Sequence, residues 1–180
     1  GGTAAADFRK TWLRKRQIRG MLIRWKDNRK ESGAAMEPHL EQLKKLLNEE
    51  DRFCRYNGIQ VETIRPGSAE AVMEVCEESL NGLGAVQGGA IFTLADLALA
   101  AAANSRGSKA VTQNSTISYL RPGSGRKLRA VATEVSRGRR TGLYEVEVRG
   151  ENGKLVAKIM SGVFISEERF DFFPAEKKEA

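Results

Sequence analysis

The stretch from Gly89 to Ser105, GAIFTLADLALAAAANS, is almost entirely apolar, and it constrains the fold more than any other part of this 180-residue chain. Its pattern predicts a helix in which Thr93 and Asp96 are the only polar side chains before Asn104. A helix that is apolar all round is buried on every side, so the rest of the chain must enclose it. A carboxylate is rarely buried without a partner or a purpose. Asp96 is therefore the first candidate for a functional residue.

Two glycines, Gly88 and Gly89, stand where this predicted helix begins. Glycine lets a substrate approach the backbone closely, and the first N–H groups of a helix have no partner inside it. We expect these N–H groups to hold a developing negative charge. Burial of Asp96 nearby predicts a raised pKa, which makes a carboxylate a better base near neutral pH.

The segments on either side of the predicted helix alternate between apolar and polar residues, as strands with one buried face do. Six strands are predicted, at 59–64, 69–75, 110–120, 128–135, 143–148 and 155–165, and a helix with a leucine stripe is predicted from Pro38 to about Asn57. Short turns such as Asn152-Gly153 join the last four strands, so the sheet is mainly antiparallel. The prediction is an α+β fold in which the sheet curls around the central helix.

The net charge of +7 belongs to the N-terminal arm. Residues 1–35 hold ten Lys and Arg against three Asp and Glu, which leaves the remainder of the chain neutral. Ile18, Met21, Leu22 and Trp25 lie on one helical face among the arginines, a pattern that predicts a basic amphipathic helix. We favour an arm that packs on its own or a neighbouring subunit. Contact with a membrane or nucleic acid, or a targeting role, is an alternative.

The cysteines and the histidine argue against metal chemistry. Cys54 and Cys76 form no CxxC motif and His39 is the only histidine, so we expect no metal site and no histidine base. Two free thiols are typical of a reducing compartment, and we see no secretory signal and no uncharged apolar run long enough to span a bilayer. We therefore expect a cytoplasmic protein.

Four blocks of residues follow one another along 81–142. They are Asn81-Gly82-x-Gly84-x-x-Gln87-Gly88-Gly89, Ile91-Phe92-Thr93-Leu94-Ala95-Asp96 with Asn104-Ser105, Ser118-Tyr119-Leu120-Arg121-Pro122-Gly123, and Arg137-Gly138-Arg139-Arg140-Thr141-Gly142. In this order they resemble the hotdog-fold thioesterases, specifically the PaaI-like (phenylacetic acid degradation) branch of acyl-CoA thioesterases. The resemblance implies a hotdog domain at 36–168, between the helical extension 1–35 and a charged tail at 169–180.

The resemblance also implies roles for individual residues. Asp96 is expected to act as general base or nucleophile, and the N–H groups of Gly88 or Gly89 to polarise the thioester carbonyl. Asn81 is expected to position water or substrate, and Thr112 to reach the site of a partner subunit. The family forms homodimers, often paired into tetramers. It implies acyl-CoA as substrate, with an aryl or medium-chain acyl group, and no separate cofactor.

One position departs from the pattern. The family usually has histidine where this chain has Gln87, which forms similar hydrogen bonds but does not titrate. Arg121, Arg137, Arg139 and Arg140 are the candidates for binding the phosphates of coenzyme A. An acyl-CoA thioesterase is the preferred interpretation. The alternative is a non-catalytic acyl-CoA-binding hotdog protein or regulator with a basic arm.

Overall fold

The computed structural model describes residues 36–174. The predicted basic helix of residues 1–35 and the end of the charged tail, 175–180, lie outside the described residues. The proposed roles of both segments therefore stay predictions.

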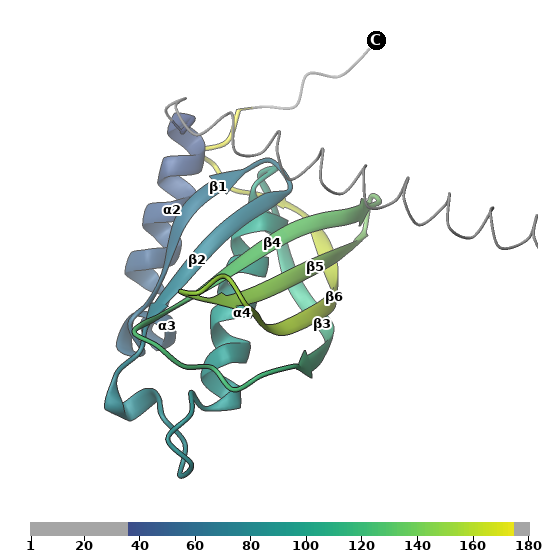
Figure 1. Cartoon of the computed structure of the whole chain (residues 1–180). Coiled ribbons are helices and arrows are strands. Elements are labelled where there is room, and N and C mark those ends of the chain that lie inside the picture. Colours follow the sequence, from purple (N-terminus) through teal and green to yellow (C-terminus); the bar gives the residue numbers. More distant parts are fainter. Residues whose placement is uncertain (1–35, 175–180) are drawn as a thin grey trace, which may run out of the picture. The chain divides into compact units, whose positions relative to one another are not determined.

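Six antiparallel strands form one sheet in the order β1-β2-β4-β5-β6-β3 (Figure 1). The strands are β1 (Ile59–Arg65), β2 (Ser68–Glu74), β3 (Ser108–Tyr119), β4 (Lys127–Arg137), β5 (Thr141–Gly150) and β6 (Leu155–Arg169). All six predicted strands are present, and several run a few residues further than their alternation showed. The sheet leaves β1 and β3 as its two edges.

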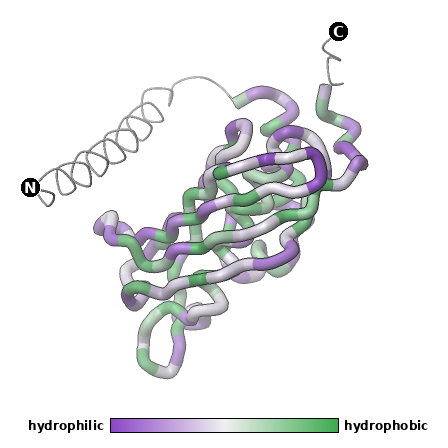
Figure 2. Tube along the Cα trace, turned by 90° about the vertical axis from the view of Figure 1, so that its right-hand side faces the viewer, coloured by the Kyte–Doolittle hydropathy of each residue, from purple (hydrophilic) through white to green (hydrophobic). Residues whose placement is uncertain are grey.

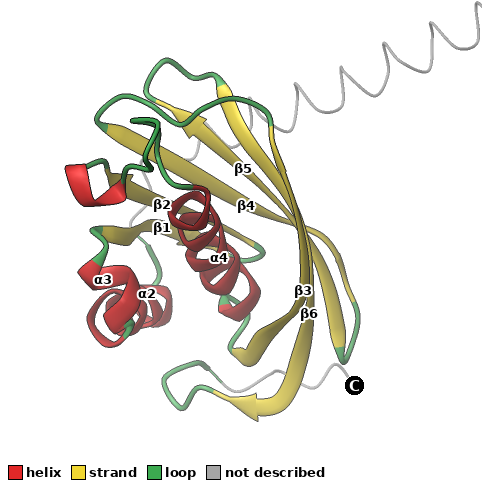
Figure 3. Cartoon of the chain, turned by 90° about the horizontal axis from the view of Figure 1, so that it is seen from below, coloured by secondary structure: helices red, strands yellow, loops and turns green. Residues whose placement is uncertain are grey.

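The central helix α4 (Gly88–Asn104) packs against the concave face of this sheet (Figure 3). Inward-facing side chains such as Val146, Val148 and Ile159 alternate along the strands with outward-facing charged ones, an alternation that the hydropathy colouring follows (Figure 2). The outward-facing charges pair across strands, as Lys158 does with Glu145 at 3.0 Å. The predicted α+β hotdog fold, a sheet wrapped around a buried helix, is confirmed.

The prediction that α4 is buried on every side is wrong along one stripe. Gly89, Thr93, Asp96 and Ala100 are partly or fully exposed, and Phe92 beside them is half-buried. These positions recur every three or four residues and so share one helical face. The sheet curves around the other faces but ends at the edge strand β3, so this face stays open within the chain. The candidate acid therefore lies on the open face of the helix.

The predicted helix from Pro38 to Asn57 is divided into α2 (Pro38–Glu50) and α3 (Arg52–Tyr56). Asp51 separates them because its backbone leaves the helical region and its carboxylate accepts a hydrogen bond from the Cys54 N–H at 2.9 Å. An aspartate that caps a new helix in this way ends the preceding one. A short 3₁₀ helix, η1 (Glu77–Ser79), follows β2.

The C-terminal end of the last strand leads into an aromatic cluster on the core. Phe170, Phe172 and Phe173 lie together, and the Phe173 ring is 4.7 Å from the ring of His39 on α2. The Phe170 N–H donates to the Gly107 carbonyl at 2.9 Å. Residues 170–173 thus pack against the domain that was predicted to end at 168.

Gly107 is expected to be indispensable for this packing. It has φ +90°, and a Cβ there would lie 2.7 Å from Cδ1 of Phe173. Gly153 has φ +73° with no atom within 4 Å of such a Cβ, so Gly153→Ala is the matched control for backbone strain alone. We expect Gly107→Ala to lose about 1–3 kcal/mol more of unfolding free energy than Gly153→Ala, measured by denaturant titration. Equal losses of unfolding free energy in the two variants would show that the packing of the aromatic cluster does not depend on Gly107.

Candidate active site

Asp96 lies midway along the open stripe of α4 and contacts the edge strand. The Thr112 hydroxyl on β3 donates a hydrogen bond to Oδ1 of Asp96 at 3.1 Å. The side chains around the carboxylate are those of Phe92, Ala95, Leu99, Ser115, Ile159 and Ser161. Within the chain Thr112 contacts Asp96, and its predicted contact with the site of a partner subunit stays a prediction.

The surroundings of Asp96 shift the pKa of its carboxyl group. Burial raises the pKa of the Asp96 carboxyl above its usual value, and the hydrogen bond from Thr112 acts in the opposite direction. The negative charge of Asp51, at the start of α3, raises the pKa further. The result is a half-buried carboxyl with a raised pKa, the property predicted from the sequence and the one a general base near neutral pH requires.

The N-terminal end of α4 presents free backbone donors. The Gln87 side chain caps the helix, since its Oε1 accepts from the Ala90 N–H at 3.1 Å, and its carbonyl accepts from Ile91. The N–H groups of Gly88 and Gly89 have no hydrogen-bond partner within residues 36–174. Gln87 therefore shapes the end of the helix and leaves two amides available to an anion or an oxyanion.

Side chains lie close to both glycines. A Cβ on Gly89 would lie 2.7 Å from Oε1 of Gln87, and one on Gly88 would lie 3.2 Å from the ring of Tyr119. The Tyr119 hydroxyl donates to the Gly88 carbonyl at 2.8 Å and so fixes the end of β3 to the start of α4. Sequence reasoning treated Tyr119 only as a strand residue. Its place in the Ser118–Gly123 block, just before Arg121, was the available signal.

Asn81 shapes the loop that leads into α4. Its Oδ1 accepts from the N–H groups of Leu83 and Ala85, at 2.9 and 3.2 Å, and its own N–H donates to the Ala85 carbonyl at 2.7 Å. The carboxamide oxygen is thus used within the loop. The described contacts of Asn81 do not include Asp96, and its contact with substrate or water stays a prediction.

The free amides and the acid lie far apart along one helix. Gly88 and Asp96 are eight residues apart, which is about 12 Å along the axis at 1.5 Å per residue. A reacting carbonyl needs a donor about 3 Å away and the acid within reach on the other side. Within one chain the predicted catalytic groups therefore do not meet on a single small group.

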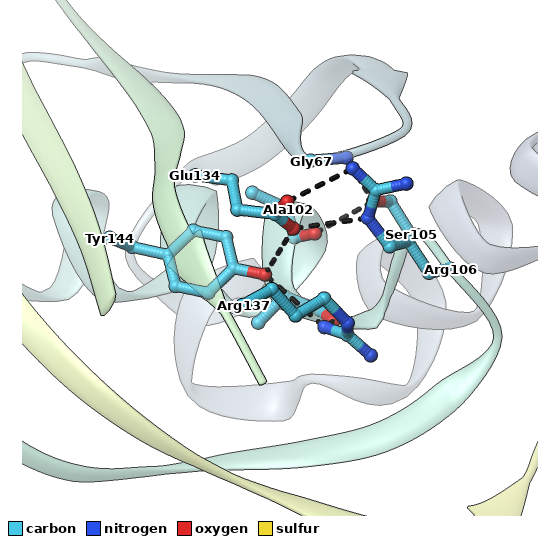
Figure 4. Close-up of polar contacts among 8 residues, drawn as sticks. Gly67, Ala102, Ser105, Arg106, Glu134, Arg137 and Tyr144 are labelled. Carbon is cyan, nitrogen blue, oxygen red and sulfur yellow. Dashed lines mark hydrogen bonds and ion pairs between the residues drawn. The ribbon is translucent and has the colours of Figure 1, made fainter. Parts of the chain in front are cut away.

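Arg137 lies at the opposite end of α4, in a network of polar side chains (Figure 4). Its guanidinium donates to the Ala103 carbonyl at 3.1 Å and to the Tyr144 hydroxyl at 3.3 Å. The Tyr144 hydroxyl donates to Glu134, which forms an ion pair with Arg106 at 3.0 Å. These contacts join Arg137 to the C-terminal end of the helix, and a contact with coenzyme A is untested.

The other predicted phosphate-binding arginines are distributed over both ends of the domain. Arg140 pairs with Glu167 at 2.6 Å and stacks over the Phe164 ring, whereas Arg139 is exposed and has no ion-pair partner in the described part of the chain. Arg121 lies at the end near Gly88 and donates to the Leu155 carbonyl at 2.9 Å. The four arginines do not form one cluster.

Cys54 does not have the character of a nucleophile. Cys54 is buried, and burial together with Asp51 raises its pKa to about 12. No group of three or more His, Cys, Asp and Glu side chains placed to hold a metal ion occurs within 36–174. In the same range, no helix has both the length and the apolar character that crossing a bilayer requires.

The chain is similar to known thioesterases in both sequence and structure. Residues 83–157 match the Thioesterase superfamily. The acyl-coenzyme A thioesterase PaaI of Escherichia coli is 39% identical over 112 residues, which cover 62% of this chain and 80% of that protein. The structure of the E. coli PaaI protein from the phenylacetic acid degradation operon superposes with a TM-score of 0.71 at 32% identity, over 75% of this chain and 99% of that one.

A Streptococcus mutans protein solved with acetyl CoA bound is also similar. It is 32% identical with a TM-score of 0.59, and the match covers 62% of this chain and 91% of that one.

The hydrogen bond between Thr112 and Asp96 is expected to be measurable as a pKa change. Removing the hydroxyl in Thr112→Val withdraws a donor that favours the charged carboxylate, so the pKa of Asp96 rises further. Thr112→Ser keeps the hydroxyl and is the control. Carboxyl-carbon NMR titration is the measurement. An Asp96 pKa that is the same in Thr112→Val and in wild type would contradict the contact.

Proposed function

Because this chain belongs to the Thioesterase superfamily, in its PaaI-like branch, we propose that it hydrolyses an acyl-CoA thioester to the free acid and coenzyme A. The observation that carries the proposal is the half-buried Asp96, with its raised pKa, on the same open stripe as the free helix amides. The relative solved with acetyl CoA supports an acyl-CoA ligand. An aryl or medium-chain acyl group remains the expected substrate class.

In the proposed chemistry, Asp96 and the free amides at the start of α4 have separate tasks. Asp96 takes a proton from water while the water oxygen attacks the thioester carbonyl carbon. The oxygen that becomes negative is held by the N–H groups of Gly88 and Gly89, and one such donor typically contributes about 100- to 1000-fold in rate. The tetrahedral intermediate then collapses, the carbon–sulfur bond breaks, and the leaving sulfur takes the proton from Asp96. Direct attack by the Asp96 carboxylate is the variant of this route with a covalent anhydride.

The 12 Å separation supports a site shared between two copies of the chain. The midpoint between Gly88 or Gly89 and Asp96 falls at Phe92–Thr93, on the open stripe itself. A two-fold axis near this point would set two α4 helices antiparallel and bring Asp96 of one subunit opposite the Gly88 and Gly89 amides of the other. Each dimer would then contain two complete sites.

The edge strand β3 favours the same arrangement. Its free side is not paired within the described residues, and Val111 on it is 64% exposed. An unpaired edge with exposed apolar side chains is a surface that a second copy can cover. We therefore propose a homodimer formed across the open stripe and β3. Pairing of dimers into tetramers stays a prediction.

A non-catalytic acyl-CoA-binding protein is the second candidate, favoured by Gln87 in place of the usual histidine. Gln87 acts as a helix cap through Oε1, a task that needs no titratable proton. The geometry therefore gives the substitution a structural role that is compatible with catalysis.

Asp96→Asn separates the two candidates. A general base contributes about 100- to 10,000-fold, so we expect kcat to fall by about that factor with little change in KM. Because the pKa of the Asp96 carboxyl is raised in the folded state, its stabilising contribution is lost as the pH rises from the unfolded-state pKa through the folded-state pKa. The variant cannot ionise, so it is expected to be no less stable than wild type at pH 7. Release of free thiol from a panel of aryl and medium-chain acyl-CoA thioesters measures the rate, and thermal melting measures the stability.

Asp51→Asn is the control for loss of one negative charge in this region. It keeps an oxygen that caps α3 and leaves Asp96 in place, so most of the activity is expected to remain. A wild-type protein that releases no thiol from any member of the panel would overturn the enzyme proposal. An Asp96→Asn protein of undiminished rate would overturn the catalytic role of Asp96.

A further inference from the structure

We propose that a β-bulge at Gln113 in the edge strand β3 turns Thr112 toward Asp96, and that the residues just after the bulge hold it in place. The neighbours of Gln113 on β3 pair with two consecutive residues of β6, Val163 and Gly162, so Gln113 is an extra residue in this ladder. β3 and β6 lie side by side next to α4 (Figure 3). The inference rests on the proposed hydrolysis, because it assigns positioning residues to the acid in that reaction.

The side chains of β3 change phase at the bulge. Before it, Ala110 packs on the core and Thr112 reaches α4, and after it Ile117 and Tyr119 face the same side of the sheet. An unbroken strand turns every second side chain to one face, so even-numbered and odd-numbered positions would face opposite sides. One inserted residue reverses this alternation. The bulge therefore accounts for the change from even to odd numbers along the inner face of β3.

Two contacts between β3 and α4 depend on this change of phase. The Thr112 hydroxyl donates to Oδ1 of Asp96 at 3.1 Å, and the Tyr119 hydroxyl donates to the Gly88 carbonyl at 2.8 Å. In a strand without the bulge, Thr112 and Tyr119 would face opposite sides of the sheet, and one of the contacts would be lost. β-Bulges next to active sites often redirect a side chain in this way. The bulge thus lets one strand contact both the acid and the amide end of the helix.

Side-chain contacts on both faces of the sheet fix the register directly after the bulge. On the outer face, Oδ1 of Asn114 accepts from the Gly162 N–H at 3.3 Å, and a Cβ on Gly162 would lie 3.0 Å from Nδ2 of Asn114. On the inner face, the hydroxyls of Ser115 and Ser161 form a hydrogen bond of 2.7 Å. A slip of one residue would break both contacts, so they hold the extra residue at position 113.

The serine pair lies among the side chains around Asp96. Ser161 is 1% exposed, and Leu99 and Ile159 are among its neighbours there. Hydroxyls placed among apolar side chains lose their hydration, so Ser115 and Ser161 need each other as partners. Compared with two alanines of similar volume, the hydroxyls add a directional bond between β3 and β6. This bond is three residues from Thr112 along β3.

The other groups that act on Asp96 belong to the α3 region and not to β3. The charge of Asp51 raises the pKa of the Asp96 carboxyl, and the charge of Asp96 in turn raises the pKa of the Cys54 thiol. Neither residue contacts the bulge through a described hydrogen bond. A change at the serine pair therefore reaches Asp96 through Thr112.

The test removes the serine pair and follows the pKa of Asp96 by carboxyl-carbon NMR titration of the full chain. In Ser115→Ala/Ser161→Ala we expect this pKa to rise by at least half of the increase that Thr112→Val produces, because a looser bulge weakens the hydrogen bond to the carboxylate. In a Thr112→Val background the same two substitutions should leave the pKa unchanged. Thr116→Ala removes an exposed hydroxyl from the other face of β3 and is the matched control, with the wild-type pKa expected.

Deletion of Gln113 tests the bulge itself. Without the extra residue we expect Thr112 to leave Asp96, so the pKa of Asp96 should rise as far as it does in Thr112→Val. Gln113→Ala keeps the residue count, and therefore the bulge, and the pKa of Asp96 should stay at its wild-type value. If the deletion variant does not fold, the serine variants decide the question.

The titration needs no turnover, so its result is independent of the enzyme proposal. If wild type hydrolyses acyl-CoA thioesters, the pH at which kcat is half-maximal should move upward in the serine double variant together with the pKa of Asp96. An Asp96 pKa equal to that of wild type in the double variant overturns the positioning role. A shift of equal size in the wild-type and Thr112→Val backgrounds also overturns it, because the serines would then act on Asp96 without Thr112.

Discussion

The packing of α4 against the concave face of the sheet is the contact on which the rest of this structure depends. Ala98, Ala101 and Ala102 on the helix are fully buried, and their small side chains let the strands approach closely. Close packing on a curved sheet covers most of the helix surface but not all of it, because the sheet ends at β3. The uncovered stripe is where Asp96 keeps partial contact with solvent and gains the hydrogen bond from Thr112.

The two ends of α4 differ in how many of their backbone groups form hydrogen bonds. At the C-terminal end, Arg137, Ser105 and Asn104 bind the carbonyls of Ala103, Ala102 and Ala100. At the N-terminal end, Gln87 caps one N–H, and those of Gly88 and Gly89 stay without a partner within 36–174. A helix end with free donors and a positive dipole favours a negative oxygen. The bonds at the C-terminal end anchor the helix, and the free donors at the N-terminal end are those that the proposed mechanism uses.

Much of the fold follows from the sequence because its signals are local. Strand alternation, turn residues and the apolar run of α4 each predict an element, and Asp96 stands out as the one carboxylate in that run. The open stripe was missed because it results from the curvature of the sheet, which no single segment encodes. The break at Asp51 was missed because a capping aspartate inside a leucine stripe was read as part of one helix.

The arginines show a second limit of sequence reasoning. Arg137, Arg139 and Arg140 share one loop, yet Arg137 turns inward to Ala103 and Tyr144, and only tertiary contacts decide that direction. Arg121 and Lys154 are far apart in the sequence and meet at one cavity. Charge patterns in the sequence therefore do not locate a phosphate-binding site, and phosphate binding by these arginines stays a prediction.

The central claim is that each site combines Asp96 of one subunit with the helix amides of the other, and subunit mixing tests it most directly. Gly88→Pro removes one amide donor at a helix position that tolerates proline, and Asp96→Asn removes the acid. Each variant alone is expected to be nearly inactive. Refolded together in equal amounts, they should regain about a quarter of the wild-type rate, since half of the dimers are mixed and each mixed dimer has one intact site. A mixture no more active than its two parents would contradict the shared site.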